Sequence, residues 1–84
     1  MKNELSGMKA FVTVAELGSF SKAAEQLNLT QPALTKKIKK IEGNLNIALF
    51  ERTTRKIALT QAGKMLLPKA KALIASLDAA IFNL

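Results

Sequence analysis

The chain has 84 residues, a formal net charge of +7, and neither cysteine nor histidine. This length allows one small domain, and the missing thiols and imidazoles exclude disulfides, the usual zinc sites and catalysis by a nucleophile beside a histidine. With only six acidic residues as well, we expect no enzyme and no bound cofactor or metal.

The first third of the chain predicts two short helices. Ser6 is a suitable N-cap for the first, and Gly18 is expected to end it. The second is expected to start after Ser21, as its N-cap, and to reach Leu27 with Ala24 facing inward. The first helix has apolar residues at helical spacing, namely Met8, Phe11, Val12 and Ala15.

A third helix is predicted to be apolar on one face and basic on the other. It follows a three-residue turn over 28–30, with Thr30 as its N-cap and Pro32 in its first turn, where no backbone N–H is needed. Asn46 is expected to end it, because asparagine tolerates positive φ. The apolar face holds Leu34, Ile38, Ile41 and Leu45. The opposite face holds Pro32, Thr35, Lys36, Lys39 and Lys40.

The hydrophobic period changes between Ala48 and Thr60. Two short apolar runs, 49–50 and 57–59, flank polar residues 52–56, and this predicts a β-hairpin.

Thr60 is expected to cap a long last helix that runs to the end of the chain, with Pro68 kinking it or lying in its second turn. An apolar heptad seam along this helix predicts pairing with a second copy; the alternative is that the helix folds back on its own domain. The predicted dimerisation residues are Leu66, Ala70, Leu73, Ile74, Leu77, Ile81 and Leu84.

Basic charge is concentrated in the middle of the chain. Before Lys36 three lysines are balanced by three glutamates, whereas from Lys36 to Lys71 ten basic residues face two acidic ones, a charge of +8. This asymmetry indicates a surface for a polyanion, the alternative being that the charge only keeps the protein soluble.

Two short helices, a turn, a capped basic helix and a hairpin predict a mainly α fold, a winged helix-turn-helix. The major groove admits one helix, and the residues of its first turn meet the base edges. Gln31 suits adenine and Lys36 can reach guanine, whereas Lys39 is placed for phosphates. The alternative for each is a solvated helix face. The expected base-facing residues are Gln31, Pro32, Ala33, Thr35 and Lys36.

A resemblance to a known family is carried by three runs: FVTVAELGSFSKAAEQLNLTQPALTKKIKKIE (11–42), LFERTTRKIALTQAG (49–63) and LLPKA (66–70). In order and spacing they resemble the N-terminal DNA-binding domain of bacterial LysR-type transcriptional regulators. Two residues depart from the family pattern. Asn46 stands where glycine is usual, and Lys36 stands where arginine is common, which weakens the expectation of bidentate guanine recognition.

The resemblance implies sequence-specific binding of double-stranded DNA, with the third helix in the major groove and the hairpin, or wing, in the minor groove. Arg55 is then the minor-groove residue. Arg52 is assigned to a phosphate, the alternative being an ion pair with Glu51 or another acid. The resemblance places Ser21, Lys22, Thr30 and Lys39 near phosphates.

We therefore expect a winged helix-turn-helix over residues 1–60 and a linker and dimerisation helix over 61–84. The family carries a small-molecule effector domain after this helix, so we expect the chain to be a fragment of a regulator of about 300 residues. We expect a homodimer, and the full-length protein could form a tetramer.

Two other functions compete with DNA binding. The last helix could bind anionic membranes, and the helix-turn-helix could serve protein contacts only. The chain shows neither a signal peptide nor ~18 consecutive apolar residues, so no membrane partner and a cytoplasmic location are expected.

Overall fold

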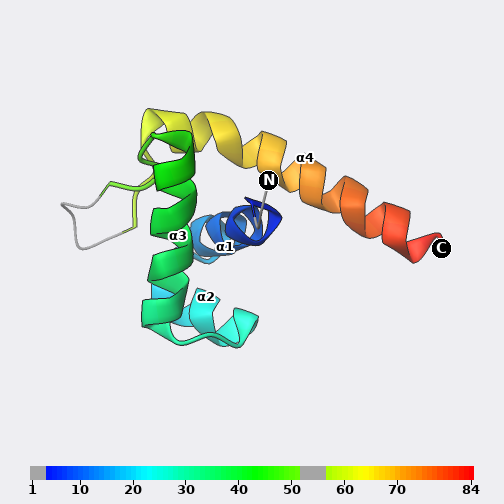
Figure 1. Cartoon of the computed structure of the whole chain (residues 1–84), viewed down its shortest axis with the longest axis horizontal. Coiled ribbons are helices and arrows are strands. Elements are labelled where there is room, and N and C mark those ends of the chain that lie inside the picture. Colours follow the sequence, from blue (N-terminus) through cyan, green and yellow to red (C-terminus); the bar gives the residue numbers. More distant parts are fainter. Residues whose placement is uncertain (1–3, 52–56) are drawn as a thin grey trace.

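Four helices are found in the computed structural model, which describes residues 4–51 and 57–84 (Figure 1). Of the connection between the third helix and the fourth, residues 46–60, the structure describes 46–51 and 57–60. The helices are α1 (Glu4–Leu17), α2 (Phe20–Leu27), α3 (Gln31–Leu45) and α4 (Gln61–Phe82).

Local capping chemistry sets most helix ends as predicted. Gly18 ends α1 with φ of 65°, and Asn46 ends α3 with φ of 56°, both in the left-handed region. Thr30 and Thr60 are the N-caps of α3 and α4, and the side-chain oxygen of each accepts a hydrogen bond from the third residue of the helix.

Two predicted caps are wrong. Helix α1 begins at Glu4, so Ser6 lies inside it, and its hydroxyl accepts a hydrogen bond from Lys37 Nζ at 2.8 Å. Helix α2 is capped by Ser19, whose hydroxyl accepts the Lys22 N–H at 3.0 Å, and Ser21 falls in the first turn. Ser19 and Ser21 are both suitable N-caps locally. Helix α2 starts after Ser19 because this brings Phe20 into the helix, where it packs against the core.

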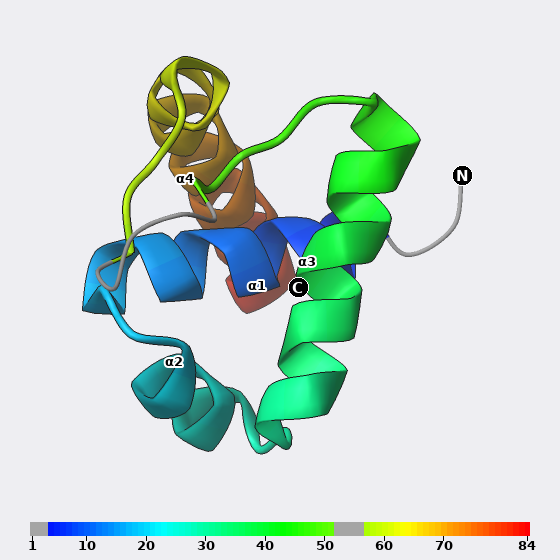
Figure 2. The ribbon, with the colours of Figure 1, turned by 90° about the vertical axis from the view of Figure 1, so that its left-hand side faces the viewer.

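The buried face of α1 differs from the predicted one. Phe11 is fully buried as expected, but its buried neighbours are Ala10 and Val14. The reason is that α2, α3 and α4 all pack on α1, so this central helix buries more than one stripe (Figure 2). The other predicted positions are half-buried around the core: Met8, Val12 and Ala15.

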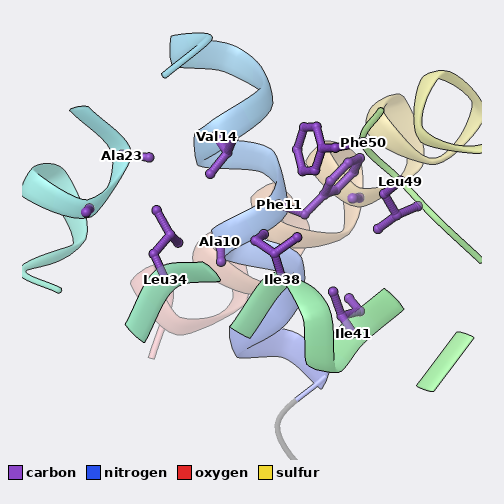
Figure 3. Packing of buried hydrophobic residues seen from close by; sticks show 11 residues of the cluster. Ala10, Phe11, Val14, Ala23, Leu34, Ile38, Ile41, Leu49 and Phe50 are labelled. Carbon is purple, nitrogen blue, oxygen red and sulfur yellow. The ribbon is translucent and has the colours of Figure 1, made fainter. Parts of the chain in front are cut away.

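The core lies where α3 crosses α1 (Figure 3). The apolar face of α3 is as predicted, with Leu34, Ile38 and Ile41 buried. The ring of Phe50, from the segment after α3, lies 5.5 Å from that of Phe11, centroid to centroid. This packing leaves the opposite face of α3 free to point outward.

The predicted β-hairpin is reduced, in the described residues, to one antiparallel bridge between Phe50 and Leu59. Two hydrogen bonds make up this bridge, from the Glu51 N–H to the Ala58 carbonyl at 2.8 Å and from the Thr60 N–H to the Leu49 carbonyl at 3.0 Å. The runs are too short to form strands there. The predicted tip, 52–56, lies outside the described residues, and so do Arg52 and Arg55.

Helix α4 is attached to the domain by its first half. A Cβ at Gly63 would overlap the Leu49 carbonyl oxygen, so the start of α4 lies directly against the backbone of the segment after α3. Further on, Ala70 is buried in the core, and Lys71 Nζ lies 2.7 Å from Glu16 Oε2 of α1. The helix continues through Pro68 and ends at Phe82, two residues before the predicted end.

The second half of α4 extends beyond the other helices, and the chain measures 43 × 25 × 22 Å along its principal axes (Figure 1). The expected heptad seam is thereby divided. Its first members, Leu66 and Ala70, pack on their own domain, so Ala70 is not available to a second copy.

Candidate nucleic-acid interface

The first two turns of α3 form an uncovered surface. Gln31, Pro32, Lys36 and Lys39 are exposed, and Thr35 is half-buried. Together these five residues line a shallow hollow of about 520 Å³. Four of the five predicted base-facing residues are therefore assembled on one face, whereas Ala33 is half-buried and does not line the hollow.

The orientation of this surface follows from the packing of α3. Because residues of an α-helix succeed one another at about 100°, burying Leu34 and Ile38 turns Thr35 and Lys39 away from the core. Thr30 begins the helix, and its side-chain oxygen accepts the Ala33 N–H at 3.2 Å. Its O–H remains able to donate, as a phosphate contact requires.

The lysines of α3 do not all point the same way. Lys36, Lys39 and Lys40 are exposed, whereas Lys37 is half-buried and donates to Ser6 of α1. The helical period accounts for the difference, since Lys37 lies about 160° around the helix from Lys39. The three exposed lysines of α3 therefore lie on one face of the helix, away from α1.

The remaining predicted phosphate residues lie on the neighbouring helix. Ser21 and Lys22 are exposed in the first turn of α2, which packs on α3. The structure therefore presents both side chains to solvent, and their contact with phosphate stays a prediction. Arg52 and Arg55 lie outside the described residues.

Sequence reasoning missed the role of Glu42. Its Oε2 accepts hydrogen bonds from the backbone N–H groups of Leu49 at 2.7 Å and Phe50 at 3.2 Å. The available signal was an acidic residue on an otherwise basic helix, on the same edge as Gln31.

The predicted dimerisation residues are found in three settings. Leu73 and Ile81 are 55% and 57% exposed, and the side chain of Leu84 is fully accessible. Ile74, Leu77 and Leu66 are half-buried, and Ala70 is buried in its own domain. Pairing through this stripe stays a prediction.

No helix within residues 4–51 and 57–84 combines the length and the apolarity needed to span a membrane.

The fold and the exposed basic helix define a winged helix-turn-helix protein. The sequence model described as "Bacterial regulatory helix-turn-helix protein, lysR family" matches residues 5–64. The chain belongs to this family.

Relatives and solved structures agree with this assignment. The chain is 61% identical over its full length to the HTH-type transcriptional regulator YbhD of Escherichia coli K12, but spans only 26% of that protein. Vibrio fischeri DarR in complex with DNA superposes with a TM-score of 0.90 at 32% identity, covering 99% of this chain and 28% of DarR. The BenM DNA-binding domain on a benA DNA site superposes with a TM-score of 0.89 at 36% identity, covering 93% of this chain and 88% of that chain.

Proposed function

We propose that this chain is the DNA-binding part of a LysR-type transcriptional regulator and recognises double-stranded DNA by sequence, without a catalytic role. The observation that carries the proposal is the uncovered basic face of α3, where Gln31, Thr35 and Lys36 lie together. Vibrio fischeri DarR and the BenM DNA-binding domain, each solved in complex with DNA, share this fold.

Base recognition is assigned to the first two turns of α3 in the major groove. Gln31 can pair with adenine through two hydrogen bonds, and Lys36 can approach guanine O6 and N7 as a point charge. Thr35 can donate or accept, while Pro32 and Ala33 offer apolar surface to a thymine methyl.

Affinity is assigned mostly to phosphate neutralisation, which does not depend on sequence. Lys39 on α3 and Lys22 on α2 supply charge, and the hydroxyls of Ser21 and Thr30 can donate to phosphate oxygens. Within this proposal Arg55 enters the minor groove, which is strongly negative where it is narrow, and Arg52 contacts a phosphate.

We propose further that residues 61–84 pair two copies, while residues 1–60 bind DNA. The exposed apolar stripe that includes Leu73 and Ile81 supports this division. A two-fold dimer would place two α3 helices on half-sites related by inversion, so the preferred site would be an interrupted inverted repeat.

The test is selection of bound duplexes from a random pool, followed by fluorescence anisotropy at physiological salt on the selected and a scrambled duplex. We expect the selected duplex to bind at least about 10³-fold more tightly. Equal affinity for both duplexes would contradict sequence recognition. No binding to either would favour a module that serves protein contacts only.

A further inference from the structure

Glu42 connects the last turns of α3 to the segment that leads into the wing. Its half-buried carboxylate accepts the Leu49 and Phe50 N–H groups through the same oxygen, Oε2, at 2.7 and 3.2 Å. Leu49 and Phe50 are themselves buried. Hydrogen bonds to a charged acceptor are stronger than neutral ones, and buried N–H groups are costly to leave unpaired. Glu42 therefore fixes the backbone at 49–50.

This backbone is the base of the wing. Phe50 forms the bridge to Leu59, and the adjacent Glu51 N–H donates to the Ala58 carbonyl at 2.8 Å. In the described part of the chain α3 packs on α1 and α2 but not on α4. The carboxylate of Glu42 is thus a direct side-chain tie between α3 and the wing base.

Glu42 lies on the same edge of α3 as the residues assigned to base reading. Glu42 lies eleven residues after Gln31, which on an ideal helix is about 16 Å along the axis and about 20° around it. The two residues therefore share one edge of α3, with Thr35 between them. An α-helix is stiff over this distance. The wing base, which is bound to Glu42, is therefore held at a fixed distance from Gln31.

We propose that Glu42 is a positioning residue that holds the wing base, the bridged backbone at Phe50 and Leu59, at a set distance from the base-reading end of α3, and so determines whether the DNA flanking the α3 contacts is read. This proposal rests on the proposed DNA binding. The minor groove is only about 6 Å wide, so a wing base released by a few ångströms no longer directs the wing into it. Glu42 then governs discrimination of the flanks and leaves discrimination by α3 intact.

Two substitutions separate the reach of the carboxylate from its charge. Glu42→Asp keeps the charge but shortens the side chain by one carbon–carbon bond of about 1.5 Å, too short for the observed contacts. Glu42→Gln removes the charge but keeps an acceptor oxygen at the same reach. A matched control is Glu51→Gln, which removes one charge from an exposed side chain beside the wing base.

Three duplexes are compared by anisotropy: the selected site, the site with scrambled flanks, and the site with the α3-contacted base pairs scrambled. For Glu42→Asp we expect the flank discrimination ratio to fall roughly two- to tenfold, the equivalent of a lost hydrogen bond. Its ratio for the α3-contacted base pairs should stay within about twofold of the wild type. Glu51→Gln should keep both ratios, and Glu42→Gln should lose less flank discrimination than Glu42→Asp, because its amide oxygen keeps the reach but not the charge.

Amide hydrogen exchange supplies a readout without DNA. The Leu49 and Phe50 amides should exchange roughly two- to tenfold faster in Glu42→Asp than in Glu42→Gln, with melting followed by circular dichroism to show that each variant is folded. If Glu42→Asp does not fold, slow exchange of these two amides in Glu42→Gln supports the tie and fast exchange overturns it.

Several outcomes overturn the proposal. These are flank discrimination that survives in Glu42→Asp, a loss in Glu42→Gln equal to that in Glu42→Asp, a proportional loss of both ratios, or a wild type that ignores the flanks. A wild type that shows no preference for any duplex instead refutes the proposed function itself, and the two failures are therefore distinguishable.

Discussion

At the scale of single residues, the outward face of α3 combines two kinds of contact that respond differently to mutation. Gln31 offers hydrogen bonds to a base edge, and Lys39 offers charge to the phosphate backbone; both side chains are exposed. A base contact changes the ratio between sites, whereas a phosphate contact changes affinity for all sites alike.

Gln31→Ala should therefore cost about 1–3 kcal/mol of binding free energy on the selected duplex and little on random DNA. Anisotropy titrations of both duplexes measure the difference. Gln26→Ala, at an exposed position of α2, is the control and should change neither value. A loss of similar size on random DNA would remove the assigned role of Gln31.

Lys39→Ala should weaken binding to every duplex by a similar factor and make the slope of log affinity against log salt shallower by about one. The measurement is a salt titration on two unrelated duplexes. Lys37→Met removes the same charge from the side of α3 that faces Ser6, and its slope should match the wild type. A loss confined to the selected duplex would make Lys39 a base contact.

At the scale of elements, the wing base and α4 meet by close backbone contact. Gly63 lies in the first turn of α4, under the Leu49 carbonyl, and Thr60 Oγ1 donates to the Ala48 carbonyl at 2.6 Å. The absence of a side chain at Gly63 therefore determines how closely α4 approaches the segment after α3.

Gly63→Ala should lower the free energy of unfolding by about 1–3 kcal/mol, because the new methyl group would overlap backbone rather than a flexible side chain. Denaturant titration followed by circular dichroism measures it. Gly43→Ala is the matched control in α3, where a Cβ meets nothing within 4 Å, and it should stabilise by up to about 1 kcal/mol. Equal stability of the two variants would show that α4 can move away from Leu49 at no cost.

The features of the fold that could be predicted from the sequence are those set by interactions between residues close together in the chain. The caps at Thr30 and Asn46 and the buried face of α3 were predictable, because each depends on residues within one or two turns. The cap of α2 was not, because the choice of Ser19 over Ser21 depends on where Phe20 packs.

Long-range contacts account for the other differences. The burial of Ala70 depends on which residues α1 presents to α4, and the hydrogen bonds of Glu42 depend on the return of the chain at 49–50. The spacing of residues along one helix predicts neither the burial of Ala70 nor the hydrogen bonds of Glu42. The exposed face of α3 was predictable because the helical period alone separates it from the core.

At the scale of the whole molecule, α4 carries an apolar stripe beyond the domain. Ile81→Glu should raise the dissociation constant of the dimer by roughly tenfold or more, because an apolar contact worth about 1.5–3 kcal/mol is replaced by a charge. Sedimentation equilibrium measures the constant. Unfolding of the monomer should be unchanged, since Ile81 is 57% exposed.

Ala79→Glu places the same charge on the opposite side of α4, about 160° around the helix from Ile81, and should leave the dimer intact. A wild type that stays monomeric at all concentrations, or equal effects of the two variants, would contradict pairing through this stripe.

The attachment of α4 by its first half makes the helix a lever arm. The free arm is the second half of the helix: residues 71–82 span about 18 Å, so a tilt of roughly 10° at a pivot after Ala70 moves the far end by about 3 Å. That displacement approaches one base-pair step of about 3.4 Å. In a dimer joined through these arms, small adjustments at the pivot would let one protein accommodate operators whose half-sites differ by a base pair in separation, with the domains themselves unchanged.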